Sequence, residues 1–140
     1  MTRLADEILS AAAYRTALRK FLARTEVVAA SAGLSSQRYN LLLLVKAGEV
    51  SKEPVTVGRL TDLLELRQTA VSELVRRAEE AGLVHRARSE VDARTSLITL
   101  TDEGDRRLMQ AFRALRCDRA ELARSFRILG REFRAVSPAG

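Results

Sequence analysis

The order of elements in residues 56–104 constrains the fold more than any other feature of the chain. The segment reads TVGRLTDLLELRQTAVSELVRRAEEAGLVHRARSEVDARTSLITLTDEG, which is two amphipathic stretches, a glycine, and two extended stretches around a polar tip. Thr56 is placed to accept a hydrogen bond from an unpaired amide at the start of the first stretch. The apolar residues that follow it at helical spacing are Val57, Leu60 and Leu63 or Leu64. This pattern predicts a short, half-buried helix.

A second helix is predicted from Gln68 to Ala81. Its apolar positions fall on one stripe, which is typical of a helix with one buried side, and comprise Val71, Leu74, Val75 and Ala78. The other positions turn polar and charged side chains outward, namely Gln68, Thr69, Ser72, Glu73, Arg76 and Arg77. Such groups suit base edges and phosphates.

A β-hairpin is predicted after the second helix. Gly82 stands where a left-handed residue ends a helix, and extended segments follow at Leu83–Arg88 and Thr95–Thr101. The polar tip between them comprises Ser89, Glu90, Val91, Asp92, Ala93 and Arg94. In the second extended segment the period of two puts Ser96, Ile98 and Leu100 on one face, of which Ile98 and Leu100 mark the core side.

Helix, helix, glycine and hairpin in this order predict a winged helix-turn-helix, so the expected fold class is mainly α with a small β-wing. A helix fits the major groove of DNA and a hairpin can reach the adjacent minor groove, so double-stranded DNA is the first partner we expect. Arg94 suits a narrow, negative minor groove, and we expect Asp92 to hold its guanidinium. The candidates for phosphate contacts are Arg67, Arg76, Arg77, Arg86 and Arg88.

The same residues have plainer interpretations. A helix-turn-helix pattern also occurs in modules that bind protein. Asp92 and Arg94 could form an ordinary exposed ion pair, and Arg76 and Arg77 could belong to a solvated helix face.

The wing segment resembles that of the MarR family of bacterial transcription regulators. GLVHRARSEVDARTSLITLTDEG is similar to the family pattern GLV-x-R, D-x-R and LT-x-x-G, and the matching positions are Gly82, Leu83, Val84, Arg86, Asp92, Arg94, Leu100, Thr101 and Gly104. The resemblance implies a homodimer that binds a pseudo-palindromic operator and is released by a small ligand or by oxidation. It also implies that Gln68, Thr69 and Ser72 are recognition-helix positions and that Asp92 and Arg94 form the wing pair.

Three residues depart from the family pattern. Arg67 stands where a small capping residue is usual, Glu65 lies in a turn where glycine or asparagine is frequent, and Thr61 replaces a common alanine. These departures affect the docking angle and the operator sequence that the resemblance would imply.

The composition is that of a globular domain, and its charge argues only weakly for DNA. The chain of 140 residues is 46% hydrophobic and 30% charged, with a formal net charge of +6. The arginines of residues 67–94 are nearly balanced there by Glu73, Glu79, Glu80, Glu90 and Asp92. The overall positive charge is therefore not concentrated in residues 67–94, the predicted reading head that would contact DNA.

Catalysis, a cofactor and a metal site are not expected. His85 is the one histidine and Cys117 the one cysteine, so neither a catalytic triad nor a metal cluster can be assembled, and a glycine-rich phosphate loop is lacking. The chain has no apolar run long enough for a membrane and no leader pattern, so we expect a cytoplasmic protein.

The two ends of the chain are predicted to be helices that form subunit contacts. Apolar residues recur near helical spacing at Leu4, Ile8, Ala11, Leu18 and Leu22, then at Leu108, Phe112 and Leu115, and again at Leu122, Phe126, Leu129 and Phe133. We expect one domain over residues 1–140, with the winged helix-turn-helix at about 35–104, dimerisation helices at about 1–30 and 105–135, and an irregular tail at Ser137–Gly140. The alternative is that these stripes complete the core of a monomer.

A further helix, from Ser35 or Ser36 to Ala47, is expected to join the reading head to the predicted dimerisation helices at the two ends of the chain. A small-molecule effector could bind at that junction, with Tyr14, Tyr39 and Phe112 as candidate contacts, although aromatic residues at helical spacing more often belong to a core. Redox sensing through Cys117 is the weaker alternative to an ordinary packed or partly exposed thiol.

Overall fold

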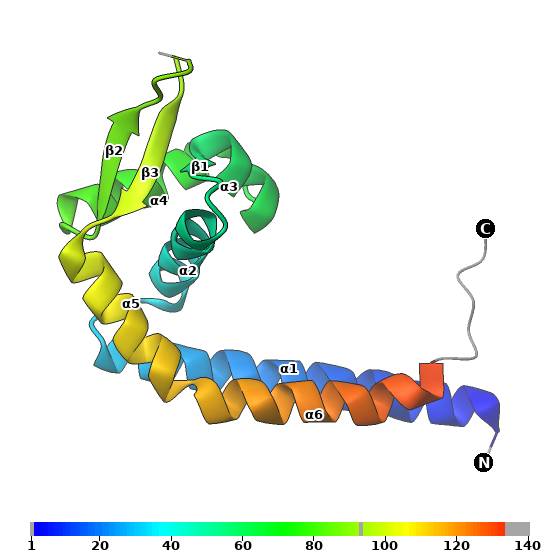
Figure 1. The fold of residues 1–140 in the computed structure, drawn as a ribbon. Coiled ribbons are helices and arrows are strands. Elements are labelled where there is room, and N and C mark those ends of the chain that lie inside the picture. Colours follow the sequence, from blue (N-terminus) through cyan, green and yellow to red (C-terminus); the bar gives the residue numbers. More distant parts are fainter. Residues whose placement is uncertain (1, 93, 134–140) are drawn as a thin grey trace. The chain divides into compact units, whose positions relative to one another are not determined.

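A computed structural model of the chain describes residues 2–92 and 94–133, without the side chains of residues 132 and 133. The elements are α1 (Arg3–Ser31), α2 (Ser36–Val50), β1 (Val55–Thr56), α3 (Val57–Leu64), α4 (Gln68–Glu80), β2 (Val84–Arg88), β3 (Ser96–Leu100), α5 (Asp102–Ala114) and α6 (Arg116–Phe133) (Figure 1). The predicted fold class, mainly α with a small β-wing, is confirmed. The predicted Ala93, the side chain of Phe133 and the tail Ser137–Gly140 lie outside the described part.

The chain divides into two compact units. The terminal unit contains the residues up to Val28 and those from Arg113 onward, and the central unit contains Ala29–Phe112. The central unit therefore holds α2 to α4, the sheet and nearly all of α5.

The helix-turn-helix of the central unit consists of α3 and α4. Thr56 caps α3 as predicted, because its Oγ1 accepts a hydrogen bond of 3.0 Å from the amide of Arg59. Arg67 is the N-cap of α4 and makes no side-chain capping bond. The predicted core stripe of Val71, Leu74, Val75 and Ala78 is buried, which confirms it. Each large side chain so buried stabilises the fold by about 1.5 to 3 kcal/mol.

The turn between α3 and α4 contains a strained residue. Glu65 ends α3 in the left-handed conformation, with φ 53°, which costs a residue with a Cβ about 1 kcal/mol or more. Because the Glu65 side chain is exposed, Glu65→Gly is expected to raise the free energy of unfolding by about 1 kcal/mol. Urea denaturation measures this change. The control Asp62→Gly, in the helical part of α3, should instead lower stability by a few tenths of a kcal/mol, and equal effects of the two glycines would contradict the assignment of strain.

The sheet has one more strand than predicted. Among the described residues it is three-stranded and antiparallel in the order β1-β3-β2, with Ile98 paired to Val55 on one side and to Arg86 on the other. The hairpin of β2 and β3 was predicted, each strand being shorter than its predicted segment. Ile98 is fully buried and Leu100 half-buried, on the expected side. β1 was missed because two residues are too few to show a period of two.

Helix α2 extends to Val50, beyond its predicted end at Ala47. Its last turn packs closely against the start of β1, since a Cβ on Gly48 would lie 2.8 Å from the carbonyl oxygen of Glu53. Next to it, Glu49 Oε1 accepts a 2.8 Å hydrogen bond from the amide of Leu100 in β3. Both contacts are tertiary, and they fix α2 against the sheet.

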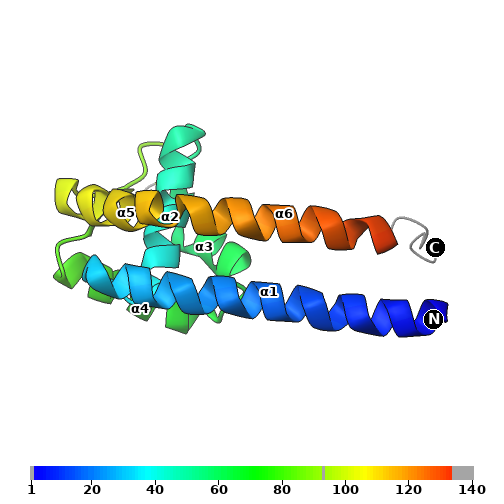
Figure 2. The same cartoon turned by 90° about the horizontal axis from the view of Figure 1, so that it is seen from below.

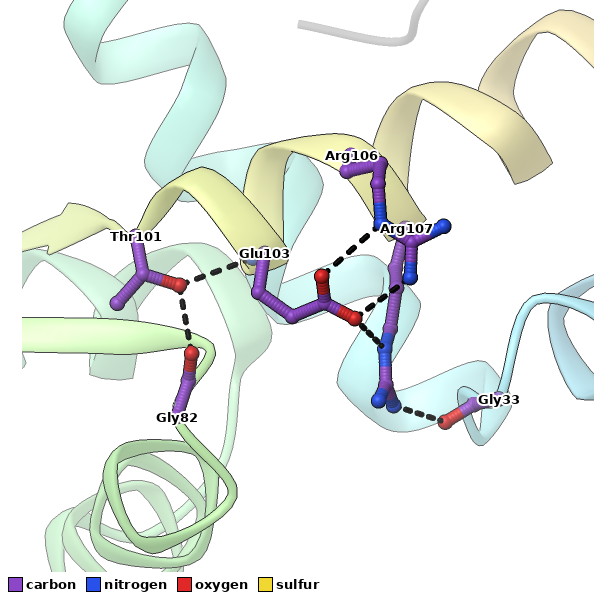
Figure 3. A network of polar contacts seen from close by, with 7 residues as sticks. Gly33, Gly82, Thr101, Glu103, Arg106 and Arg107 are labelled. Carbon is purple, nitrogen blue, oxygen red and sulfur yellow. Dashed lines mark hydrogen bonds and ion pairs between the residues drawn. The ribbon is translucent and has the colours of Figure 1, made fainter.

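The base of the wing is tied to the start of α5 by a network of polar contacts (Figure 3). Gly82, with φ 74°, ends the α4 turn as predicted, and its carbonyl oxygen accepts a 2.6 Å hydrogen bond from Thr101 Oγ1. The same oxygen of Thr101 accepts a 2.9 Å bond from the amide of Gly104. A Cβ on Gly104 would lie 2.0 Å from the carbonyl oxygen of Leu83, so only glycine allows this close approach.

Glu103 continues this network along α5. Its carboxylate accepts hydrogen bonds from Arg106 and Arg107, and Arg107 also donates to the carbonyl oxygen of Gly33 at 3.4 Å (Figure 3). The bond from Arg106 is the main cause that lowers the pKa of Glu103 to about 2. Glu103 therefore stays ionised near neutral pH and keeps both arginines along α5.

In the terminal unit, α1 and α6 run side by side in opposite directions (Figure 2). The rings of Tyr14 and Phe126 have their centres 5.2 Å apart, and Tyr14 donates a 3.4 Å hydrogen bond to the carbonyl oxygen of Phe126. Arg24 and Asp118 form an ion pair at 3.5 Å. Apolar side chains of α1 nevertheless remain exposed at Leu4, Ile8, Leu9, Leu18, Leu22 and Val27.

Candidate nucleic-acid interface

The outward face of α4 and the strand β2 together form a shallow hollow of about 430 Å³. The residues that line it are Gln68, Thr69, Ser72, Glu73 and Arg76 from α4 and Arg86 from β2. Five of these were predicted as DNA contacts, and the tertiary structure brings Arg86 to the α4 residues although 10 or more positions separate them in the sequence. The hollow offers hydroxyl, amide and guanidinium groups, which are the groups that bind base edges and phosphates.

Two of the predicted phosphate contacts on α4 are already paired with carboxylates. Arg76 binds Glu73 and Glu80, and Arg77 binds Glu73 at 3.0 Å. Hydrogen bonds from Arg76 and then Arg77 lower the pKa of Glu73 to about 2. Glu73 was predicted on the outward face of α4 but not as part of the site. The signal was available, because residues three and four apart on a helix are neighbours.

The other predicted arginines are available to a partner. Arg67, Arg86, Arg88 and Arg94 are exposed, and none of them forms an ion pair within the part of the chain that the structure describes. Arg67 lies at the start of α4, Arg86 and Arg88 lie on β2, and Arg94 lies at the wing tip. The positive charge of these four arginines therefore lies at the N-terminal end of α4 and along the wing.

The wing tip is organised by Asp92, but not through the contact that we predicted. Asp92 Oδ1 accepts a 3.0 Å hydrogen bond from the backbone amide of Arg94, and Oδ2 accepts one of 3.3 Å from Thr95 Oγ1. The prediction that Asp92 holds the Arg94 guanidinium is wrong in this structure. The short Asp92 side chain reaches the amide two residues later and closes an Asx turn. This backbone bond competes with the Arg94 guanidinium for the same carboxylate. The Arg94 side chain is left exposed.

Ser89 also shapes the tip, a role that was not predicted from the sequence. Its hydroxyl accepts hydrogen bonds from the amides of Val91 and Asp92, at 3.2 and 3.3 Å, and its own amide donates to the carbonyl oxygen of Thr95 at 2.9 Å. Val91 is 98% exposed at the tip. The hairpin extends beyond α2, α3 and α4 (Figure 1), so the tip can reach a partner that contacts α4.

The three candidate effector contacts belong to different units. Tyr14 lies in the terminal unit, where it packs on Phe126, whereas Tyr39 is buried and Phe112 half-buried in the central unit. A joint site for Tyr14, Tyr39 and Phe112 stays a prediction. Cys117 is an exposed thiol near the start of α6.

The described residues contain neither a metal cluster nor a membrane-spanning helix. None of their histidine, cysteine, aspartate and glutamate side chains form a group of three or more that could hold a metal ion. No helix among the same residues has the length and apolar character to cross a membrane.

Comparisons with known proteins agree with this geometry. Residues 32–95 match the family model described as MarR family. Wild-type apo MarR from E. coli is 18% identical, with a TM-score of 0.70 over 89% of this chain and 93% of that chain. A mutant of E. coli MarR complexed with operator DNA gives 18% identity and a TM-score of 0.70, over 89% of this chain and 90% of that chain. YusO from Bacillus subtilis is 19% identical, with a TM-score of 0.66 over 95% of this chain and 96% of that chain.

A search of curated proteins gave no match. The matched residues 32–95 contain α2, β1, α3, α4 and β2, and so include α4 and β2, the two elements that form the hollow, and both of its arginines. The fold likeness to MarR structures extends over most of the chain. Residues 32–95 of this chain are therefore similar to the MarR family, and the fold over most of the chain is that of the solved MarR structures.

Proposed function

We propose that the protein is a sequence-specific DNA-binding transcription regulator, a ligand-responsive repressor that acts as a homodimer. The observation that carries the proposal is the hollow between α4 and β2, where Gln68, Thr69 and Ser72 lie beside Arg86. Exposed amide and hydroxyl groups on a helix can read base edges in the major groove. The unpaired arginines of the wing supply the phosphate contacts that fix the register.

The homodimer is supported by the surface of the terminal unit. A groove of about 560 Å³ runs between α1 and α6, lined mainly by apolar and small side chains such as Ala13, Ala17, Leu122 and Leu129. Ile8 and Leu22 on α1 are 59% and 55% exposed, and Ile128 on α6 is 58% exposed. Apolar surface of this extent on two neighbouring helices is typical of a protein interface. A second copy related by a two-fold axis would cover it and present two reading heads to two half-sites.

The effector response rests on the family resemblance. Tyr14, Tyr39 and Phe112 remain the candidate contacts, and a fall in operator affinity on adding an aromatic ligand would support them.

The proposed function is tested by fluorescence titration of the full chain against the promoter region upstream of its own reading frame. We expect the affinity for that duplex to exceed the affinity for random duplex by about 10³-fold or more at physiological salt. Equal affinities would contradict sequence-specific regulation and would favour a winged helix that binds protein.

The dimer is tested by placing charge on the exposed face of α1. The double variant Ile8→Asp, Leu22→Asp is expected to give a monomer, because unpaired carboxylates would be buried in the interface. Light scattering measures the molecular mass. Val50→Asp is the matched control, because Val50 is 73% exposed on α2 in the central unit, and it should remain dimeric. A double variant that keeps the wild-type mass would show that this face is not the interface.

A further inference from the structure

Glu73 is an acidic residue on a surface that we propose to face a polyanion. It lines the hollow with Gln68, Thr69 and Ser72, and 43% of its side chain is exposed. A carboxylate in this place repels phosphate groups. By itself this repulsion lowers the affinity for any DNA. The position of Glu73 therefore calls for a second role that offsets the repulsion.

The contacts of Glu73 show what it does. Arg76 donates to it through two nitrogens, from Nε to Oε2 at 2.8 Å and from Nη2 to Oε1 at 2.6 Å, which is the rigid fork geometry of an arginine and a carboxylate. Arg77 Nε donates to Oε1 at 3.0 Å. One carboxylate thus binds two guanidinium groups along α4, and Glu80 binds that of Arg76 as well.

Glu73 stays ionised over the whole range of pH in which the protein would bind DNA. The hydrogen bond from Arg76 is the largest cause that lowers the pKa of Glu73 to about 2, followed by that from Arg77. The pKa of Arg76 is raised by the same hydrogen bond. The carboxylate is therefore ionised whenever α4 meets DNA.

We infer that Glu73 is a specificity-determining positioning residue, which keeps Arg76 and Arg77 from binding phosphates in arbitrary registers. The inference rests on the proposed function, because it concerns how the same α4 face distinguishes its operator from other double-stranded DNA. Binding to random sequence depends almost entirely on phosphate contacts, and flexible arginines can make them in any register. Arginines held by Glu73 reach phosphates only where the bases also fit Gln68, Thr69 and Ser72.

Glu73→Gln tests the inference, because it keeps the size of the side chain and removes its charge. We expect the affinity for random duplex to rise about threefold to tenfold at low salt, with the slope of log K against log salt steeper by about 1 to 2. The affinity for operator duplex should change less, so the ratio of the two affinities should fall. Glu79→Gln is the matched control, since Glu79 is exposed on the same helix and forms no ion pair within the described residues.

A triple variant checks that the arginines carry the effect. In the variant that combines Glu73→Gln with Arg76→Gln and Arg77→Gln, the slope of log K against log salt should no longer be steeper than in the wild type. If Glu73→Gln acted only by loosening the helix, removing the two arginines would not restore the slope. Circular dichroism confirms that each variant is folded.

The outcomes separate the inference from the proposed function. If the wild type prefers its operator but Glu73→Gln and Glu79→Gln have equal effects on random duplex, only net charge matters and the inference is wrong. An unchanged ratio of operator to random affinity in Glu73→Gln also overturns it. If the wild type shows no sequence preference, the proposed function fails, and the role of Glu73 in selectivity fails with it.

Discussion

Gly104→Ala is expected to lower the free energy of unfolding by about 3 kcal/mol or more, a large fraction of the stability of a small domain. The added Cβ would lie 2.0 Å from the carbonyl oxygen of Leu83 and 2.9 Å from its carbonyl carbon. Both are backbone atoms, so no side chain can move aside. The start of α5 would have to separate from the wing base, and the hydrogen bond from Gly104 to Thr101 would weaken. Urea denaturation measures the loss.

Gly58→Ala is the matched control for this prediction. Gly58 lies in α3, and its added Cβ would be 3.7 Å from Thr56 Oγ1, which is ordinary van der Waals contact. Alanine there should raise stability by about 0.5 to 1 kcal/mol through its better helix propensity. If Gly104→Ala were as stable as the wild type, the close approach of α5 to Leu83 would not exist in solution.

Arg94→Ala is expected to reduce operator affinity by about 1 to 3 kcal/mol, which is roughly 5-fold to 150-fold, and to relax specificity. Arg94 is exposed at the tip of the wing, and its backbone amide is fixed by Asp92. Among the described residues the guanidinium forms no ion pair, which leaves it available for insertion into a narrow minor groove. Fluorescence titration against operator duplex and against a duplex with a widened minor groove measures both effects.

Arg88→Ala supplies the comparison, because it removes the same charge from β2 of the same wing. A phosphate contact at Arg88 predicts that operator and random duplex weaken alike, with a salt slope lower by about 1. Indistinguishable behaviour of Arg94→Ala and Arg88→Ala would mean that Arg94 contacts only phosphate.

The elements that depend on local interactions were predictable. The stripe from Val71 to Ala78 follows from the helical repeat, the cap at Thr56 from a hydroxyl three residues before an amide, and the left-handed Gly82 from the absence of a Cβ. Each interaction joins residues within about one turn of helix. A pattern in the sequence is enough to reveal contacts of that kind.

The candidate site was predictable only as a set of residues. Gln68, Thr69 and Ser72 were placed on one face, and the structure brings Arg86 to them from another element. The pairing of Glu73 and the backbone contact of Asp92 were missed, because a carboxylate chooses among several donors within reach. That choice depends on the local geometry of each donor, which residue type and spacing do not specify.

The sequence by itself determined the order of the helices and the hairpin, the buried side of α4 and the residues that could meet DNA, since all of these depend on periodicity and on single-residue backbone preferences. Only the tertiary structure decided that Val55 and Thr56 add a strand, that Glu49 binds the amide of Leu100 51 residues away, and that Gly104 lies against Leu83. These contacts join segments distant in the chain, and each forms only once hydrophobic packing of α2, α4 and the sheet has brought the backbones within hydrogen-bonding distance.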